Sequence, residues 1–338
     1  MKERIRRAKL SKVNKERLDH INEIIEEYNE QGLTLTLRQL YYQLVSRDVI
    51  PNKQSEYSKL STLLKEGRMG GIVDWEAIED RLRVPSKPSS WDTPKDILNS
   101  ALYSYAKPRM KGQDNYIEVW VEKDALSGVL KRITESYHIH ILVNRGYSSV
   151  SAMYDSYKRF SSAINRNQKV YILYLGDFDP SGVDMIRDIR DRIKEFLLQD
   201  ESIFDRWYSH PDRNQLIHKI IDEQGVDAQT AEDAAQESWI EEFVNEQFSV
   251  RPIALTKEQI QQYKPPPNPA KLQDPRAKKF VDRNGSQSWE VDALKPEVLN
   301  SILDSNIRDL IDFDKYKDIV ESEQEDKDKI KSLIKSFE

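Results

Sequence analysis

Residues 169–182 read KVYILYLGDFDPSG, in which a run of mostly β-branched or aromatic apolar residues leads directly into two alternating aspartates. A run this short, bounded by a lysine and by the turn signal DPSG, predicts a buried strand of a parallel sheet rather than a helix. Ligands of such sheets bind at the carboxyl ends of the strands, where Asp177 and Asp179 fall. Because Phe178 points the other way, both carboxylates are expected on one side of the chain. The alternative is a polar turn with an aspartate before proline.

A second strand pattern also ends in an acid. Residues 116–126, YIEVWVEKDAL, are apolar up to Glu122 and then continue as a helical pattern. Carboxylates gathered at one sheet edge repel each other unless a cation joins them. Ligands that are all oxygen suit a hard divalent ion, and Mg²⁺ is the expected one. Glu122 could alternatively be only a helix-start residue near the positive end of the helix dipole.

Composition narrows the class of protein. The 338 residues are 38% hydrophobic and 33% charged, which leaves room for two soluble domains. A run of about eighteen apolar residues is missing, as is an apolar N-terminal stretch, so we expect no membrane span, no secretory signal and a cytoplasmic location. The lack of cysteine excludes disulfides, thiolate zinc sites and a cysteine nucleophile.

Charge is distributed unevenly along the chain. The net charge of −6 does not indicate a nucleic-acid-binding protein, but lysine and arginine dominate the first residues. We interpret residues 1–14 as a basic N-terminal arm suited to phosphate contacts. Such arms are also common as solvated chain ends.

Residues 15–83 contain three short helical patterns followed by a glycine-bearing segment at Gly70 and Gly71. Three helices and a glycine-bearing ribbon in so short a segment predict a winged-helix DNA-binding domain. The third helix would offer Lys59, Lys65 and Arg68 to DNA phosphates, although a solvated face explains them equally well.

The second helical pattern carries a candidate nucleophile. Thr36 and Gln39 form a capping box, and leucines then mark the buried face. At about 100° per residue, Tyr41 falls among these leucines, whereas Tyr42 lies about 100° away and is expected outside the core. Arg38 is one turn before Tyr42 on the same face, where a guanidinium can approach the phenol or a phosphate. An ordinary surface tyrosine is the alternative.

The rest of the chain predicts an α/β domain. Residues 84–93 contain two prolines and three serines and are predicted to be an interdomain linker. Alternating strand and helix patterns in residues 94–312 predict βαβ units, with a polar helical elaboration at 184–247. Residues 313–338 are rich in both lysine and acid, and we predict a charged C-terminal tail that is a solvated or frayed helix.

Three short motifs resemble a known family. VEKDAL, followed about fifty residues later by LGDFDPSG, resembles a Toprim domain, the metal-binding module of topoisomerases and primases. The DxDPxG form, in which Ser181 stands in place of a third aspartate, is similar to the A subunit of topoisomerase VI, as is RQLYY at residues 38–42. That family includes the meiotic double-strand-break protein and the short, free-standing mini-A relatives of mobile elements. The resemblance implies an N-terminal winged-helix domain followed by a Rossmann-like Toprim domain with a parallel sheet.

The resemblance also implies a chemistry. Tyr42 would be the nucleophile, Arg38 would assist it, Glu122 would be the catalytic acid/base, and Glu122, Asp177 and Asp179 would bind Mg²⁺. The implied activity is that of a type IIB topoisomerase A subunit, which makes reversible double-strand breaks in DNA through a 5′-phosphotyrosyl link. The implied partners are double-stranded DNA, a second copy in a homodimer whose tyrosines work with the Toprim domain of the other subunit, and a separate ATPase (B-type) subunit.

Two other functions are consistent with the same residues. A hydrolytic Toprim nuclease of a mobile element or defence system would use metal-bound water and would not need Tyr42. A DNA-binding component would show no cleavage until a partner docks. A tyrosine-linked DNA adduct separates the first function from the second, and cleavage by the isolated chain separates both from the third.

Overall fold

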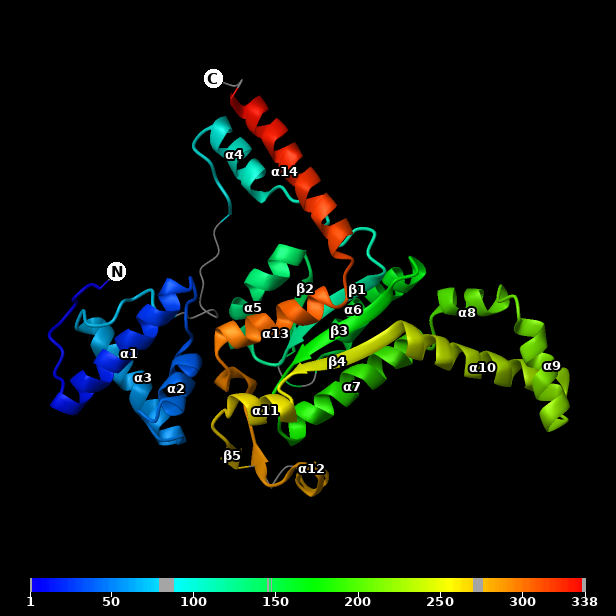
Figure 1. Ribbon diagram of the computed structural model, residues 1–338, viewed down its shortest axis with the longest axis horizontal. Helices are drawn as coiled ribbons and strands as arrows, with labels where there is room; N and C mark the ends of the chain where they lie inside the picture. The colour runs from blue at the N-terminus through cyan, green and yellow to red at the C-terminus, as the bar shows by residue number, and fades with distance from the viewer. Residues whose placement is uncertain (1, 79–87, 145, 147, 270–275, 336–338) are drawn as a thin grey trace.

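The computed structural model describes residues 2–78, 88–144, 146, 148–269 and 276–335. It shows an α/β protein with a four-stranded parallel sheet at its centre (Figure 1). On one side of the sheet lies a unit of three helices, residues 2–78, which we call the helical domain. The sheet and the helices that cover it, within residues 113–312, form the sheet domain.

The helical domain contains the three predicted helices. They are α1 (Lys12–Glu30), α2 (Leu37–Ser46) and α3 (Gln54–Met69). Their apolar stripes meet in one core that includes Leu18 of α1 and Leu40 of α2. The predicted capping box is present, because the Thr36 side chain accepts from the Gln39 N–H and the Gln39 side chain accepts in return from Thr36.

Two expectations for this domain are not met: the glycine-bearing ribbon after α3 and the free basic arm before α1. After Gly70, the described residues up to Ile78 form turns and single bridges rather than paired strands. The basic N-terminal segment packs along the end of α3, where Arg4 bridges Gly70 and Arg6 pairs with Glu66 at 2.5 Å. A winged helix is therefore not established, and the arm is docked rather than extended.

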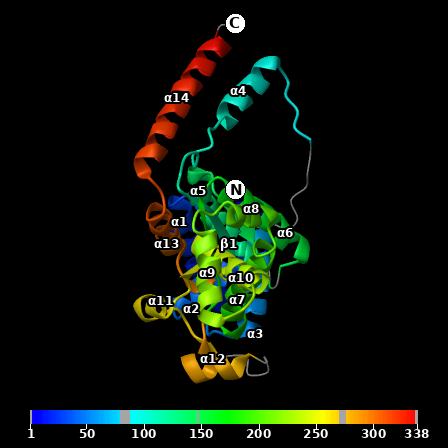
Figure 2. The same cartoon turned by 90° about the vertical axis from the view of Figure 1, so that its right-hand side faces the viewer.

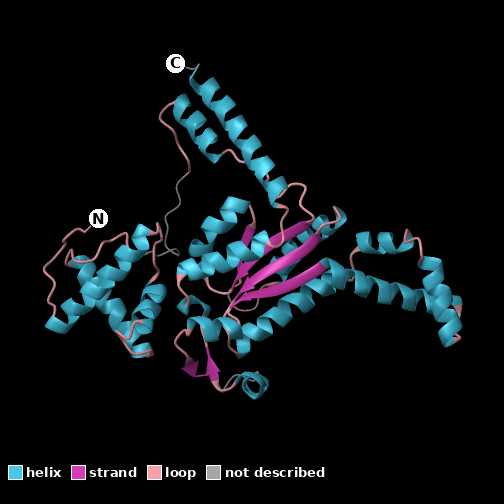
Figure 3. Cartoon of the chain, in the orientation of Figure 1, coloured by secondary structure: helices cyan, strands magenta, loops and turns pink. Residues whose placement is uncertain are grey.

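The central sheet has the strand order β2-β1-β3-β4, with all neighbours parallel (Figure 3). Its strands are β1 (Asn115–Val121), β2 (His140–Val143), β3 (Lys169–Leu175) and β4 (Phe248–Ala254). Strands β1 and β3 coincide with the two predicted apolar runs. Because side chains alternate along a strand, Val119 and Val121 enter the core on one face, and Trp120 enters the core on the other.

Helices cover both faces of the sheet. One face packs against α5 (Asp124–Tyr137) and α13 (Pro296–Arg308). The other face packs against α6 (Val150–Asn165) and α7 (Pro180–Leu197). The predicted βαβ units are confirmed.

A helical extension follows α7 and projects from the edge of the sheet (Figure 1). It consists of α8 (Glu201–Tyr208), α9 (Arg213–Gln224) and α10 (Ala228–Gln247). These helices fall within the elaboration predicted at 184–247, but the first residues of that range belong to α7, which packs on the sheet. The chain beyond β4 then forms small elements near the carboxyl edge of the sheet. These are α11 (Lys257–Tyr263), β5 (Asn268–Pro269), α12 (Ala277–Asn284), β6 (Gln287–Ser288) and the 3₁₀ turn η1 (Val291–Ala293).

The C-terminal tail is a largely exposed helix, in agreement with the solvated helix that was predicted, but it is packed on one side rather than frayed. α14 (Phe313–Lys335) packs against α4 (Pro94–Ser104), and the two stand away from the sheet together (Figure 2). Glu323 is buried in this pair because its carboxylate accepts from Arg109 at 2.8 Å and from the Lys107 N–H at 3.0 Å.

Residues 84–87 of the predicted linker lie outside the described residues, while 88–93 are neither helix nor strand. None of the helices in the described parts of the chain carries an apolar stretch of membrane-spanning length.

Candidate active site

The carboxyl edge of the sheet brings Glu122 and Asp177 together, as predicted. Val121 and Leu175 are register partners at the ends of β1 and β3, so the residues that follow them leave the sheet side by side. The Asp177 N–H donates to Glu122 Oε2 at 2.8 Å. Gly176 permits this approach, since a Cβ there would lie 2.9 Å from the same oxygen.

The two alternating aspartates have different surroundings. Asp177 Oδ1 accepts from the Val291 N–H at 2.9 Å and lies 2.7 Å from the Lys123 ammonium. Asp179 is instead the N-cap of α7, where its Oδ1 accepts from the Gly182 N–H at 2.7 Å. The turn role that was the alternative for this motif is thus what Asp179 performs in the structure.

Burial has the largest effect on the pKa values of Asp177 and Glu122. It raises the pKa of Asp177 to about 7, although Lys123 acts in the opposite direction. Burial also raises the pKa of Glu122, with Asp179 and Asp292 adding to the rise. Such groups gain from a nearby cation, because a positive charge stabilises the ionised form.

The residues fit the chemistry of Mg²⁺ but do not form a ready-made cage for it. Glu122, Asp177 and Asp179 supply only oxygen, the donor that this ion prefers. Within the described ranges, however, no three acidic, histidine or cysteine side chains are arranged so that they could hold a metal ion. Binding would require Asp177 to exchange its contact with Lys123 and Asp179 to turn from its capping position.

Three residues at this edge were missed by the sequence prediction. Lys123 Nζ lies 2.7 Å from Asp177, 2.8 Å from Glu290 and 2.9 Å from Asp292. Burial alone would lower the pKa of this lysine, yet the carboxylates of Asp292, Asp177 and Glu290 raise it above its ordinary value. The acidic spacing of WEVDAL, which repeats that of GDFD, was the signal that could have identified Glu290 and Asp292.

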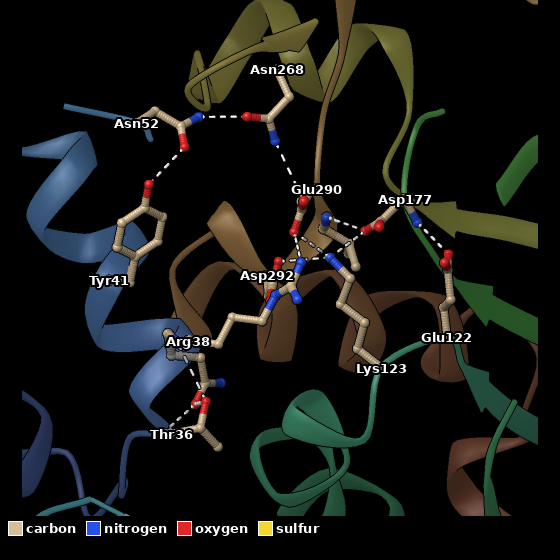
Figure 4. A network of polar contacts seen from close by, with 12 residues as sticks. Thr36, Arg38, Tyr41, Asn52, Glu122, Lys123, Asp177, Asn268, Glu290 and Asp292 are labelled. Atoms are coloured by element: carbon tan, nitrogen blue, oxygen red, sulfur yellow. Dashed lines mark hydrogen bonds and ion pairs between the residues drawn. The ribbon is translucent and has the colours of Figure 1, made fainter. Parts of the chain in front are cut away.

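Arg38 of the helical domain contacts the same acidic pair (Figure 4). Its Nε lies 2.8 Å from Asp292 Oδ2, and its Nη2 contacts Glu290. The guanidinium also lies 5.9 Å from the centre of the Tyr42 ring, which confirms that Arg38 and Tyr42 share a face of α2.

Tyr42 is buried, with 5% of its surface exposed, so the expectation that it lies outside the core is wrong. The periodicity of α2 describes that helix alone, whereas η1 of the sheet domain packs against it and Ala293 enters the same core. Burial, followed by the charge of Asp292 and a hydrogen bond to Glu290, raises the pKa of Tyr42 above its ordinary value.

The Tyr41 side chain makes its contacts to other residues of the helical domain. Its hydroxyl donates to Asn52 Oδ1 at 3.0 Å and to the Lys53 carbonyl at 3.2 Å. Its ring packs edge-on against Tyr57. A structural role therefore suits Tyr41, and Tyr42 is the better candidate nucleophile.

The predicted DNA-contacting residues of α3 differ from one another. Lys65 is exposed, and Lys59 is exposed but pairs with Glu56 at 2.7 Å. Arg68 is half-buried and donates to the carbonyls of Trp75 and Ile78 at 3.0 and 2.7 Å. Arg68 thus supports the helical domain rather than presenting its guanidinium to a phosphate.

The candidate nucleophile and two candidate metal ligands line one pocket between the domains. It has a volume of 410 Å³ and is predominantly polar. The lining residues from the helical domain are Arg38, Tyr41, Tyr42, Asn52, Gln54 and Tyr57, and those from the sheet domain are Asp177, Asp179, Asn268, Ser288, Trp289 and Glu290. A tyrosine, an arginine and carboxylates thus meet within one chain, whereas the family resemblance implies a meeting across two.

Comparison with known proteins gave no match, whether with family models, with curated proteins or with solved structures.

Proposed function

We propose that this chain cleaves duplex DNA in the manner of the A subunit of topoisomerase VI, through a covalent link between Tyr42 and a 5′-phosphate. The observation that carries the proposal is that Tyr42, Arg38, Asp177 and Asp179 line one pocket although they come from two domains. A nucleophile, a cation for the phosphate and carboxylates for a hard metal ion are the groups that transesterification of a phosphodiester needs.

In the proposed reaction the Tyr42 phenol releases its proton to solvent, its oxygen forms a bond to phosphorus, and the bond between phosphorus and the 3′ oxygen breaks. Arg38 holds the phosphate and balances the charge that develops on it. Glu122 donates a proton to the departing 3′ oxygen, a role supported by the burial that raises its pKa and favours its protonated form. Mg²⁺, if held by Asp177, Asp179 and the ionised form of Glu122 that this proton transfer leaves, would supply additional charge stabilisation at the phosphate.

A homodimer is part of this proposal. Cutting both strands requires two tyrosines on antiparallel strands, and a two-fold assembly presents them with matching symmetry. Passage of a second duplex through the break would further need a separate ATPase chain, since the sequence has no phosphate-binding loop of the P-loop type.

A hydrolytic nuclease is the second candidate, and the burial of Tyr42 favours it. A phenol with a raised pKa is a poor nucleophile at neutral pH. Water activated at the carboxylates would then cut DNA without any covalent intermediate.

One experiment separates these functions. Supercoiled plasmid is incubated with the purified protein and Mg²⁺, quenched with detergent and divided into samples with and without protease. The proposal predicts linear DNA that enters the gel only after protease treatment, and no cleavage in excess chelator. Linear DNA free of protein would support the hydrolytic nuclease, and intact plasmid would indicate a component that needs a partner.

A further inference from the structure

Two of the polar contacts between the helical domain and the sheet domain meet at Glu290 (Figure 4). In the first, Arg38 binds Glu290 and Asp292. In the second, the Asn52 amide donates to Asn268 Oδ1 at 2.6 Å. Asn268 in turn reaches Glu290 at 3.4 Å, so the two contacts belong to one network.

The first contact has the form of a phosphate site. Two separate nitrogens of the Arg38 guanidinium meet two acidic groups, as they would meet two oxygens of a phosphodiester. The acids are well shielded from water, because the Asp292 side chain is fully buried and that of Glu290 is 24% exposed. A DNA phosphate therefore cannot bind these nitrogens while the acids remain on them.

The charge around the pocket also opposes DNA in this arrangement. Five carboxylates face two cations, Arg38 and Lys123, so the formal charge is negative. The carboxylates are Glu122, Asp177, Asp179, Glu290 and Asp292. Like charge repels a phosphodiester, whereas separating Arg38 from the acidic pair would leave an unpaired guanidinium on the helical domain.

The closed contact also holds Tyr42 in an unreactive state. Tyr42 is covered by η1 and hydrogen-bonds Glu290. Burial alone would raise the pKa of Glu290, but Lys123 and Arg38 lower it to about 2, so this carboxylate accepts a proton from a phenol only at great cost.

We propose that Glu290 and Asp292 take, on the Arg38 guanidinium, the place of a DNA phosphodiester, and that duplex DNA displaces them as the helical domain separates from the sheet domain. The inference rests on the proposed function only in taking DNA as the substrate. It assigns Arg38 a phosphate-binding site that the chain itself masks, and it makes the exposure of Tyr42 depend on DNA.

The first measurement is the distance between the domains. The natural chain has no cysteine, so a pair of spin labels can be placed by Asp19→Cys on exposed α1 and Asp309→Cys after α13. Double electron–electron resonance should give one short distance between the labels in the free protein and a longer one after addition of a 30-base-pair duplex at fixed salt. Glu290→Gln should lengthen the distance without DNA.

The second measurement is the affinity for DNA, which is determined from the fluorescence anisotropy of the same duplex. Loss of the competing charge in Glu290→Gln should tighten binding by about fivefold or more, the lower end of the usual range for coupled equilibria. Asn268→Ala, which removes the second contact, should change affinity in the same direction by a smaller factor. Glu297→Gln is the matched control, because this acid is exposed on α13 and its ion pair with Lys295 is long, at 4.0 Å.

The outcomes separate this inference from the proposed function. Unchanged distances and affinities in both Glu290→Gln and Asn268→Ala would overturn the masked site, as would a wild-type distance that DNA leaves unaltered. Opening by DNA would uphold the masked site even if no tyrosine adduct ever forms. Tyrosine adducts that form while the domains stay closed would support the proposed DNA cleavage and would show that Glu290 and Asp292 do not block the Arg38 site.

Discussion

Removing the Lys123 ammonium should destabilise the sheet domain and make its stability depend on divalent metal. In Lys123→Met, the acids Asp177, Glu290 and Asp292 lose the cation that lies within 2.9 Å of each of them. Breaking a buried ion pair from one side costs about 3–5 kcal/mol. Arg38 still contacts Asp292 and the Val291 N–H still reaches Asp177, so we expect the lower end, about 3 kcal/mol.

The loss should depend on pH in a defined direction. Burial already raises the pKa of Asp177 to about 7, and without Lys123 it should rise further. A carboxyl group whose pKa is higher in the folded than in the unfolded state destabilises the protein once it ionises. This destabilisation grows as the pH rises from the unfolded-state pKa to the folded-state pKa. The deficit of Lys123→Met should therefore be wider at pH 8.5 than at pH 6, where the carboxyl group is protonated.

Urea unfolding followed by far-ultraviolet circular dichroism measures this deficit, with and without Mg²⁺. If the carboxylates bind the ion, Mg²⁺ should restore part of the lost stability in Lys123→Met and should stabilise the wild type less, because Lys123 there competes with the ion for Asp177. Lys131→Met is the control, since this lysine is exposed on α5 and pairs only with Glu135. A variant as stable as the wild type at both pH values, with no response to Mg²⁺, would refute this account of the acidic edge.

Three further predictions concern other parts of the chain. Glu323→Gln should lower the protection of α14 amides against hydrogen exchange by about 2 kcal/mol, whereas exposed Glu321→Gln should not. Because Arg109 lowers the pKa of Glu323 to about 2 from 4.5, the stabilisation by this ionised group should be full above pH 4.5 and be lost as pH falls towards 2. Lys65→Ala should reduce the salt dependence of DNA binding by about one phosphate, while Arg68→Ala should lower the thermal midpoint instead. Light scattering should show a dimer on DNA, and a monomer there would contradict the two-fold cleavage scheme.

Local pattern was sufficient to predict the α/β class, two strands of the sheet and the three helices of the helical domain. Short apolar runs that end in polar residues gave β1 and β3, and the capping box at Thr36 gave the start of α2. The meeting of Glu122 and Asp177 followed from the parallel sheet, because both leave neighbouring strands at the same edge.

Contacts between distant segments were beyond such patterns. Lys123 and Glu290 are 167 residues apart, and nothing near either residue specifies that they pair. The burial of Tyr42 depends on η1, which no analysis of α2 alone includes. Glu323 looked like one more solvated charge of the tail, yet Arg109, which lies in the loop after α4 and is 214 residues away in the sequence, compensates its burial.

Mass spectrometry of the trapped adduct shows whether Tyr42 becomes linked to DNA. Wild-type protein, Tyr41→Phe and Tyr42→Phe are incubated with plasmid and Mg²⁺, denatured with detergent and digested with nuclease and protease. We expect a nucleotide attached to the peptide that contains Tyr42 in the wild type and in Tyr41→Phe, and no adduct in Tyr42→Phe. A nucleotide-bearing peptide in Tyr42→Phe, or cleaved plasmid with no adduct in the wild type, would show that Tyr42 is not the nucleophile.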